Sequence, residues 1–253
     1  MFNIGLNTFK EIVRNKFLYL ILFFAFVFII FSLSLGQLTI WDDSKVIVDF
    51  GLAMIEIFWI IWVLFVWSQL LFKEVEWKTI FLILSKPIRR YEFILWKFLG
   101  FSWTIFLIIL FQAILFLGVL FLKDIEIDYL IIWSLIFTFF KLEILLSLVF
   151  FLSTFMSNML TILVSMMIYF LSHSFSLLIT MAERTKNELI IYSTKWLQLL
   201  FPPFEAINIK DKIGIFKDYS INFFLFNTFY SLVYLAILLT FAVIIFDRKK
   251  FER

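Results

Sequence analysis

The chain has 253 residues, of which 64% are apolar, 22% are aromatic and 16% are charged, and its formal net charge is +3. This composition excludes a soluble globular domain and indicates a membrane protein, and the small net charge gives no reason to expect a nucleic-acid partner. The absence of cysteine excludes disulfides and thiolate metal sites.

Six apolar runs are each long enough to cross a hydrocarbon layer of about 30 Å, which takes roughly 20 helical residues. Backbone groups in lipid must be hydrogen-bonded internally, so these runs are expected to be helices. We therefore predict an all-α polytopic membrane protein, with residues 1–253 forming a single transmembrane domain. The six predicted spans are approximately residues 17–35, 51–72, 98–122, 129–155, 159–181 and 223–246.

Residues 2–16, before the first span, form an amphipathic segment. Its polar face includes Lys10 and Arg14, and a basic amphipathic helix of this kind lies in the membrane interface. An ordinary juxtamembrane cap is the alternative. The predicted apolar face consists of Phe2, Leu6, Phe9 and Val13.

The second predicted span contains Glu56, roughly one turn inside its outer boundary. The simplest interpretation is that its carboxylate reaches the interface.

The stretch 73–97, between the second and third spans, is rich in charge and must lie outside the bilayer core, because a charge at the helix centre costs roughly 2.5–3.5 kcal/mol. Its first part is predicted to be a helix, and Pro87 marks a turn before a second helix. That second helix would enter the membrane with Arg89, Arg90 and Lys97 near the lipid headgroups. The predicted apolar stripe of the first helix is Trp77, Ile80, Phe81 and Leu84.

The fourth predicted span is unusual because Lys141 and Glu143 lie near its middle, where ionisable groups face a protein interior or water. Being two residues apart on a helix, they point to different faces and cannot pair well with each other. Two roles remain open, a cavity-lining role and a structural pair between helices. Glu56 is one candidate partner for the second role.

The fifth predicted span carries His173, the only histidine. A hydrogen-bonded structural role is the simplest interpretation, and a ligand or proton-relay role is the alternative. The outer loop 182–222 follows, and its apolar patch 196–201 ends at Pro202-Pro203. We expect this patch to press into the membrane surface or to pack on the helix bundle.

Charge predicts the orientation. With six spans both termini share one side, and that side collects thirteen basic and six acidic residues. The positive-inside rule therefore places both termini and the stretch 73–97 in the cytoplasm.

Three sequence patterns between residues 74 and 100 are similar to those of a known family. They are Glu74-x-Glu76-x-x-Thr79-Ile80, then Leu84-Ser85-Lys86-Pro87-Ile88-x-Arg90, then Lys97-x-x-Gly100. They resemble the permease subunits of ABC-2 type ATP-binding-cassette transporters. The opening Asn7-Thr8-Phe9-Lys10-Glu11 is similar to the amphipathic elbow helix of that family, and Leu152-Ser153-Thr154 with Ser157-Asn158 is similar to its short inner turn. Trp96 departs from the pattern, since relatives often have a small residue there.

The resemblance implies a multi-pass plasma-membrane protein that forms a substrate pathway, with export the commoner direction. It implies three kinds of partner: a second permease subunit, identical or homologous, two copies of a separate ATP-binding subunit, and membrane lipid. Short outer helices are implied before the last span. The inner stretch is similar to the coupling helix of the family, and the residues it implies for coupling are Glu74, Glu76, Lys78, Thr79, Lys86, Pro87, Arg89 and Arg90.

The sequence has no G-x-x-x-x-G-K-[ST] loop, so ATP hydrolysis is expected in a partner, and we predict no catalytic residue, metal or cofactor in this chain. A membrane-embedded enzyme and a non-catalytic assembly or anchoring protein are the alternatives, although no H-E-x-x-H motif supports the enzyme. The predicted pathway or intramembrane polar residues are Lys141, Glu143, Glu56 and His173.

Overall fold

The fold comes from a computed structural model, which describes residues 2–14, 16–38, 43–67, 89–213 and 219–248. Every regular element within these ranges is helical. In chain order they are α1 (Phe2–Val13), α2 (Lys16–Leu38), α3 (Asp43–Trp62), the π-helical turn η1 (Val63–Trp67), α6 (Arg90–Leu122), α7 (Tyr129–Ser153), α8 (Asn158–His173), α9 (Phe175–Arg184), α10 (Glu188–Leu200), the 3-10 turn η2 (Lys210–Lys212) and α11 (Ile221–Arg248).

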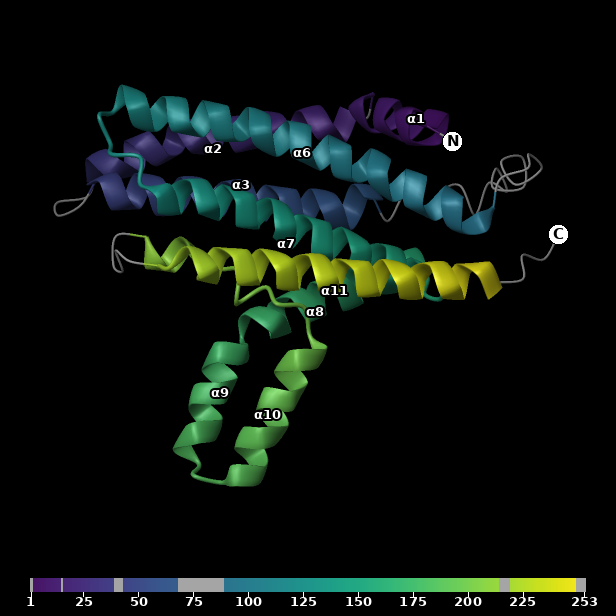
Figure 1. The fold of residues 1–253 in the computed structure, drawn as a ribbon. Helices are drawn as coiled ribbons and strands as arrows, with labels where there is room; N and C mark the ends of the chain where they lie inside the picture. The colour runs from purple at the N-terminus through teal and green to yellow at the C-terminus, as the bar shows by residue number, and fades with distance from the viewer. Residues whose placement is uncertain (1, 15, 39–42, 68–88, 214–218, 249–253) are drawn as a thin grey trace.

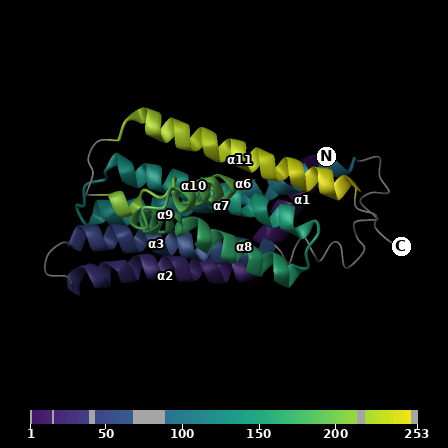
Figure 2. The ribbon, with the colours of Figure 1, turned by 90° about the horizontal axis from the view of Figure 1, so that it is seen from below.

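The long helices α2, α3, α6, α7 and α11 lie side by side as an elongated bundle (Figure 1). Helix α2 packs on α3, α11 packs on α7, and α1 packs on α6. Seen from below, α11 runs along one side of the bundle and α2 along the opposite side (Figure 2). Helix α1, the start of α6 and the last turns of α11 lie at the same end, which we call the α1 end.

Helix α7 is the centre of the bundle. Every residue from Lys141 to Phe150 is buried, so this part of the helix has no face left for lipid, whereas Ile132 and Ile136 in its first half are exposed. The two charged side chains of α7 are therefore held within protein.

Four described helices are long and apolar enough to cross a membrane. They are Ser44–Phe65, Tyr91–Leu122, Tyr129–Ser153 and Ile221–Arg248, and α8 with α9 makes a fifth if that bent pair is one span. An all-α membrane protein is thereby confirmed. Helix α2 covers the first predicted span but is not among these four, so six spans stays a prediction.

The predicted span 159–181 is not one helix. It breaks at Ser174 into α8 and α9, and the two axes differ by 50°. The Ser174 side chain donates a hydrogen bond to the carbonyl of Phe170 at 2.9 Å, and such back-bonding to the preceding turn bends helices. The apolar run continues through the break, which is why the sequence pattern missed it.

Helices α9 and α10 form a hairpin, here called the arm (residues 175–200), which projects sideways from the bundle (Figure 1). No residue of α10 is buried, and Trp196 is 69% exposed. The end of the patch 196–201 nevertheless meets the bundle, because the Tyr234 hydroxyl of α11 donates a hydrogen bond to the Leu200 carbonyl at 2.9 Å. Burial of the exposed part in the membrane surface stays a prediction.

Helix α6 has 33 residues and begins at Arg90, eight residues before the predicted third span. At 1.5 Å per residue it is about 50 Å long, or about 20 Å longer than the hydrocarbon core. Lys97, expected near lipid headgroups, is instead 1% exposed within the protein. The second part of the predicted coupling stretch is thus continuous with the span that follows it.

Helix α1 approaches α6 closely enough that two glycines meet. An ideal Cβ at Gly100 would lie 2.6 Å from the carbonyl oxygen of Gly5, so only glycine fits at this crossing. Thr8 and Ile12 are buried on the same side of α1, whereas Leu6 is 36% exposed. The helix predicted for 2–16 exists as α1 over Phe2–Val13, and Gly5 and Thr8 meet α6 at Gly100. Its position in the membrane interface stays a prediction.

Candidate functional site

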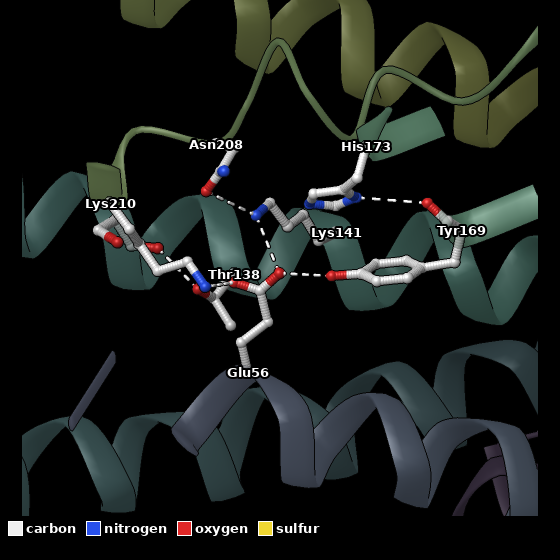
Figure 3. Close-up of polar contacts among 8 residues, drawn as sticks. Glu56, Thr138, Lys141, Tyr169, His173, Asn208 and Lys210 are labelled. Carbon is white, nitrogen blue, oxygen red and sulfur yellow. Dashed lines mark hydrogen bonds and ion pairs between the residues drawn. The ribbon is translucent and has the colours of Figure 1, made fainter. Parts of the chain in front are cut away.

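A charged cluster lies inside the bundle around Glu56 of α3 (Figure 3). Its Oε1 atom accepts a hydrogen bond from Lys141 Nζ of α7 at 2.9 Å and another from the Tyr169 hydroxyl of α8 at 2.7 Å. Lys210 Nζ of η2 pairs with Oε2. Lys141 Nζ also donates to Asn208 Oδ1 at 3.2 Å. We call these five residues the Glu56 cluster.

Burial makes these interactions strong. The side chains of Glu56 and Lys141 are each 2% exposed, and that of Lys210 is 17% exposed. Removing water lowers the effective dielectric constant, so opposite charges attract more strongly here than at a surface. Two ammonium groups share one carboxylate, which leaves the three ionised side chains with one excess positive charge.

The segment 202–213, which we call the anchor segment, carries Asn208 and Lys210 into the bundle. Phe204 is 0% exposed, and Ile207 and Ile209 are each 1% exposed. These apolar residues alternate with the two polar ones, so the segment is held both by apolar packing and by the cluster. Since it lies between the arm and α11, it fastens the outer loop of the sequence analysis to spans α3 and α7.

His173 lies at the edge of the cluster (Figure 3). Its ring contacts those of Tyr169 and Phe204, with centroids 4.5 Å and 6.0 Å away. Its Nδ1 atom is 3.4 Å from the Tyr169 carbonyl oxygen. These contacts are those of a packed, hydrogen-bonded histidine. Among the described residues no group of three or more His, Cys, Asp or Glu could hold a metal ion.

Two interpretations of Glu56 and Lys141 can now be compared with the geometry. The interpretation that Glu56 reaches the interface is wrong, because its carboxylate is enclosed by α7, α8 and the anchor segment. The alternative that offered Glu56 as a partner for Lys141 agrees with the contact between them. Both residues are in a helix-to-helix contact, and a role in a substrate pathway stays a prediction.

Glu143 does not join the cluster. It is 3% exposed and faces α6, where the Ser102 side chain interacts with it. In the described part of the chain its Oε1 atom has no hydrogen-bond partner. The two charges of α7 thus point to different neighbours, as their spacing of two residues predicts.

Most of the predicted coupling residues lie outside the described residues: Glu74, Glu76, Lys78, Thr79, Lys86 and Pro87. Arg90 is the first residue of α6. Arg89 precedes it, and its backbone N–H donates to Glu92 Oε2 at 3.0 Å. The hydrogen bond from Arg89 Nη1 to the Tyr91 hydroxyl, together with the Glu92 charge, raises the pKa of Arg89, which stays cationic.

Three members of the cluster were not singled out from the sequence: Tyr169, Asn208 and Lys210. Tyr169 is one aromatic residue among many, and no signal separates it from the others. Asn208 and Lys210 had a signal, namely the alternation of polar residues with Ile207 and Ile209 in the outer loop 182–222.

A comparison of the sequence with protein-family models finds no match, and a search of the curated proteins finds no match either.

Proposed function

We propose that the chain is the membrane-spanning permease subunit of an ABC-2 type ATP-binding-cassette transporter. In this proposal it forms a substrate pathway with a second permease, identical or homologous, and two copies of a separate subunit hydrolyse ATP. Helix α2 and the bent pair α8–α9 complete six spans in the plasma membrane, both termini face the cytosol, and transport is outward. The patterns between residues 74 and 100 supply the family resemblance.

The observation that carries the proposal is the Glu56 cluster. Ionisable side chains within spans are expensive and mark substrate or ion pathways, gates and relays. Here the cluster joins two spans to the anchor segment, which is the chain between the arm and the last span. An ion pair between a span and a loop can be made in one state and broken in another. The cluster is therefore suited to latch a gate.

The cluster supports an enzyme less well. Its carboxylate is occupied by Lys141, Tyr169 and Lys210, so no free general base is presented. A gating role needs only that these contacts be exchanged.

The test begins with the tagged full-length chain, purified from its native membranes after mild cross-linking. We expect an ATP-binding-cassette ATPase to co-purify in stoichiometric amount and to hydrolyse ATP. The charge reversal Arg89→Glu with Arg90→Glu should lower ATPase binding or uncouple hydrolysis, because it changes the end of α6 that resembles a coupling element.

The matched control is Arg184→Glu with Lys186→Glu, two exposed basic residues at the tip of the arm. This control should leave both ATPase binding and hydrolysis unchanged. Purification without any ATPase, or equal effects of the two double variants, would refute the proposal.

A further inference from the structure

A cleft with two adjoining halves lies where the arm meets α11. One half, a cavity of about 270 Å³ that we call the polar half, has polar side chains within a mainly apolar lining, and the other, a cavity of about 490 Å³ that we call the apolar half, is lined by apolar and tyrosine side chains. Leu199, Pro202 and Tyr230 line both, so the two cavities adjoin. Together they are of the size that small ligands occupy, since such sites span roughly 300–1,000 Å³.

The apolar half is shaped for a hydrocarbon chain. Leu148 of α7, Ile168 of α8 and Ile237 of α11 contribute to its wall. Ile237 and Phe241 are 46% and 52% exposed, so the cavity is open on the side of the bundle that faces lipid. An acyl chain can therefore enter sideways from the bilayer and exchange one apolar environment for another.

The polar half presents hydrogen-bonding side chains within a mainly apolar surface. Ser172 is 2% exposed and lines the cavity, and in the described part of the chain its Oγ atom has no hydrogen-bond partner. Gln198, Glu205 and Asn227 also line this half. A buried hydroxyl without a partner costs about 1–3 kcal/mol, which a ligand hydroxyl in the cavity would recover.

The charge around the polar half is balanced. Glu205 lies close enough to the Glu56 cluster to act electrostatically on Lys141. The negative charges of the Glu56 and Glu205 carboxylates thus balance the positive charges of the Lys141 and Lys210 ammonium groups. No excess charge remains for a ligand to neutralise, so the site favours a neutral headgroup over an anionic or cationic one.

We propose that this cleft binds a single-chain amphiphile with a neutral, hydroxyl-bearing headgroup, such as a monoacylglycerol. The headgroup occupies the polar half, donating to Glu205 and accepting from Gln198 or Ser172, and the chain lies along α11 towards Phe241. The cleft follows α11 from Phe226 to Phe241, which is about 22 Å of helix. This inference goes beyond the proposed transport function and does not depend on it, because binding is a property of this chain alone.

The test uses a monoacylglycerol with a photoreactive diazirine in its acyl chain, added to the full-length chain in phosphatidylcholine vesicles. Cross-linked residues are mapped by mass spectrometry after irradiation. We expect labels on the cleft face of α11 and at 199–202, displaced by unlabelled monoacylglycerol. Lysophosphatidylcholine and free fatty acid should displace the probe at least tenfold less effectively, because the first would bury the two full charges of its bulky phosphocholine zwitterion and the second the charge of its carboxylate.

Two matched pairs of variants separate the cleft from general lipid contact. Ser172→Ala should weaken binding roughly two- to tenfold, the effect of one hydrogen bond, whereas Ser165→Ala should not, although Ser165 Oγ is also buried without a partner in the described residues. Ile237→Trp should fill the apolar half and abolish the label. Ile244→Trp, on the same helix at 42% exposure and outside the cleft, should keep it.

The inference would be overturned if the labels were spread over all lipid-facing helices and if Ile237→Trp left their amount and positions unchanged. That result would indicate bulk lipid contact. Equal displacement by all three competitors would overturn the headgroup assignment. Because no ATPase is present in this experiment, neither result bears on the transport proposal.

Discussion

Glu56 and Glu143 are both glutamates buried within the bundle, at 2% and 3% exposure, but only Glu56 contacts cationic groups. Removing the Glu56 charge takes away the carboxylate that contacts the ammonium groups of both Lys141 and Lys210. Breaking a buried ion pair in this way costs about 3–5 kcal/mol. The same change at Glu143 removes a charge that has no cationic partner in the described part of the chain.

We therefore predict that two isosteric substitutions change the free energy of unfolding by different amounts. Glu56→Gln should lower the free energy of unfolding by about 3 kcal/mol, whereas Glu143→Gln should change it by less than about 1 kcal/mol or raise it, since a neutral amide costs less to bury than a carboxylate. Thermal unfolding in detergent measures both, at about 2–4 °C per kcal/mol for a chain near this size. Equal losses would show that Glu143 also has an ionic partner.

The glycines of α6 give a second residue-level prediction. A Cβ at Gly100 would meet the Gly5 carbonyl oxygen at 2.6 Å, whereas nothing lies within 4 Å of one at Gly118. Gly100→Ala should push α1 away from α6 and cost about 1–3 kcal/mol, as overpacking does. Gly118→Ala should be neutral or stabilising, because alanine is the better helix former.

Limited trypsin digestion at Lys10 and Arg14 measures this contact directly. Cleavage should become faster in Gly100→Ala and stay at the wild-type rate in Gly118→Ala. A slower or unchanged rate in Gly100→Ala would mean that α1 is held by contacts elsewhere.

At the scale of elements, the arm and the anchor segment differ sharply although they are adjacent in the chain. Trp196 of the arm is 69% exposed, whereas Phe204 of the anchor segment is 0% exposed and packs on Tyr169 and His173. Phe204→Ala should cost about 3–5 kcal/mol, the usual effect of removing a buried aromatic side chain. Trp196→Ala should leave the unfolding midpoint in detergent within a few degrees of wild type. A large loss in Trp196→Ala would indicate that the arm is packed against protein in solution.

How far the sequence predicts these elements depends on whether the governing interaction is local. The apolar runs of α7 and α11 follow from composition and length, and the structure has helices there. The break at Ser174 was missed because apolar residues continue on both sides of it, and Ser172-His173-Ser174 was the only local signal. The predicted spans begin eight residues after the starts of α3 and α6, since a helix can extend beyond the apolar core without any change in its local propensity. For α6 this extension agrees with the second helix predicted after Pro87.

The candidate site was predictable in part for the same reason. Lys141 required a partner because charge is expensive within a span, and Glu56 was a candidate because it lies in another span. The two are 85 residues apart, so nothing local could establish the contact. Lys210 was not singled out within the outer loop 182–222, because the fold of that loop back into the bundle depends on tertiary packing of Phe204, Ile207 and Ile209.

For the whole molecule, the absence of cysteine makes the orientation directly testable. We expect an impermeant maleimide, added to intact cells, to label the variants Lys123→Cys and Glu188→Cys at exposed positions. The variant Asn7→Cys in α1 should be labelled only after the membrane is permeabilised. This result follows from the excess of basic residues on the side that holds both termini. Labelling of Asn7→Cys in intact cells would reverse the orientation and contradict the coupling role.

Helix α6 has a mechanical consequence for the whole molecule. It runs without interruption from Arg90 to Leu122, and α1 packs against it at Gly100. A force applied at Arg89 therefore moves α6 as one rigid helix. A small tilt at its first residue displaces its last residue, which lies about 50 Å away. A partner ATPase that moved α6 would therefore move α1 with it. An α1 helix lying in the membrane interface would resist that movement.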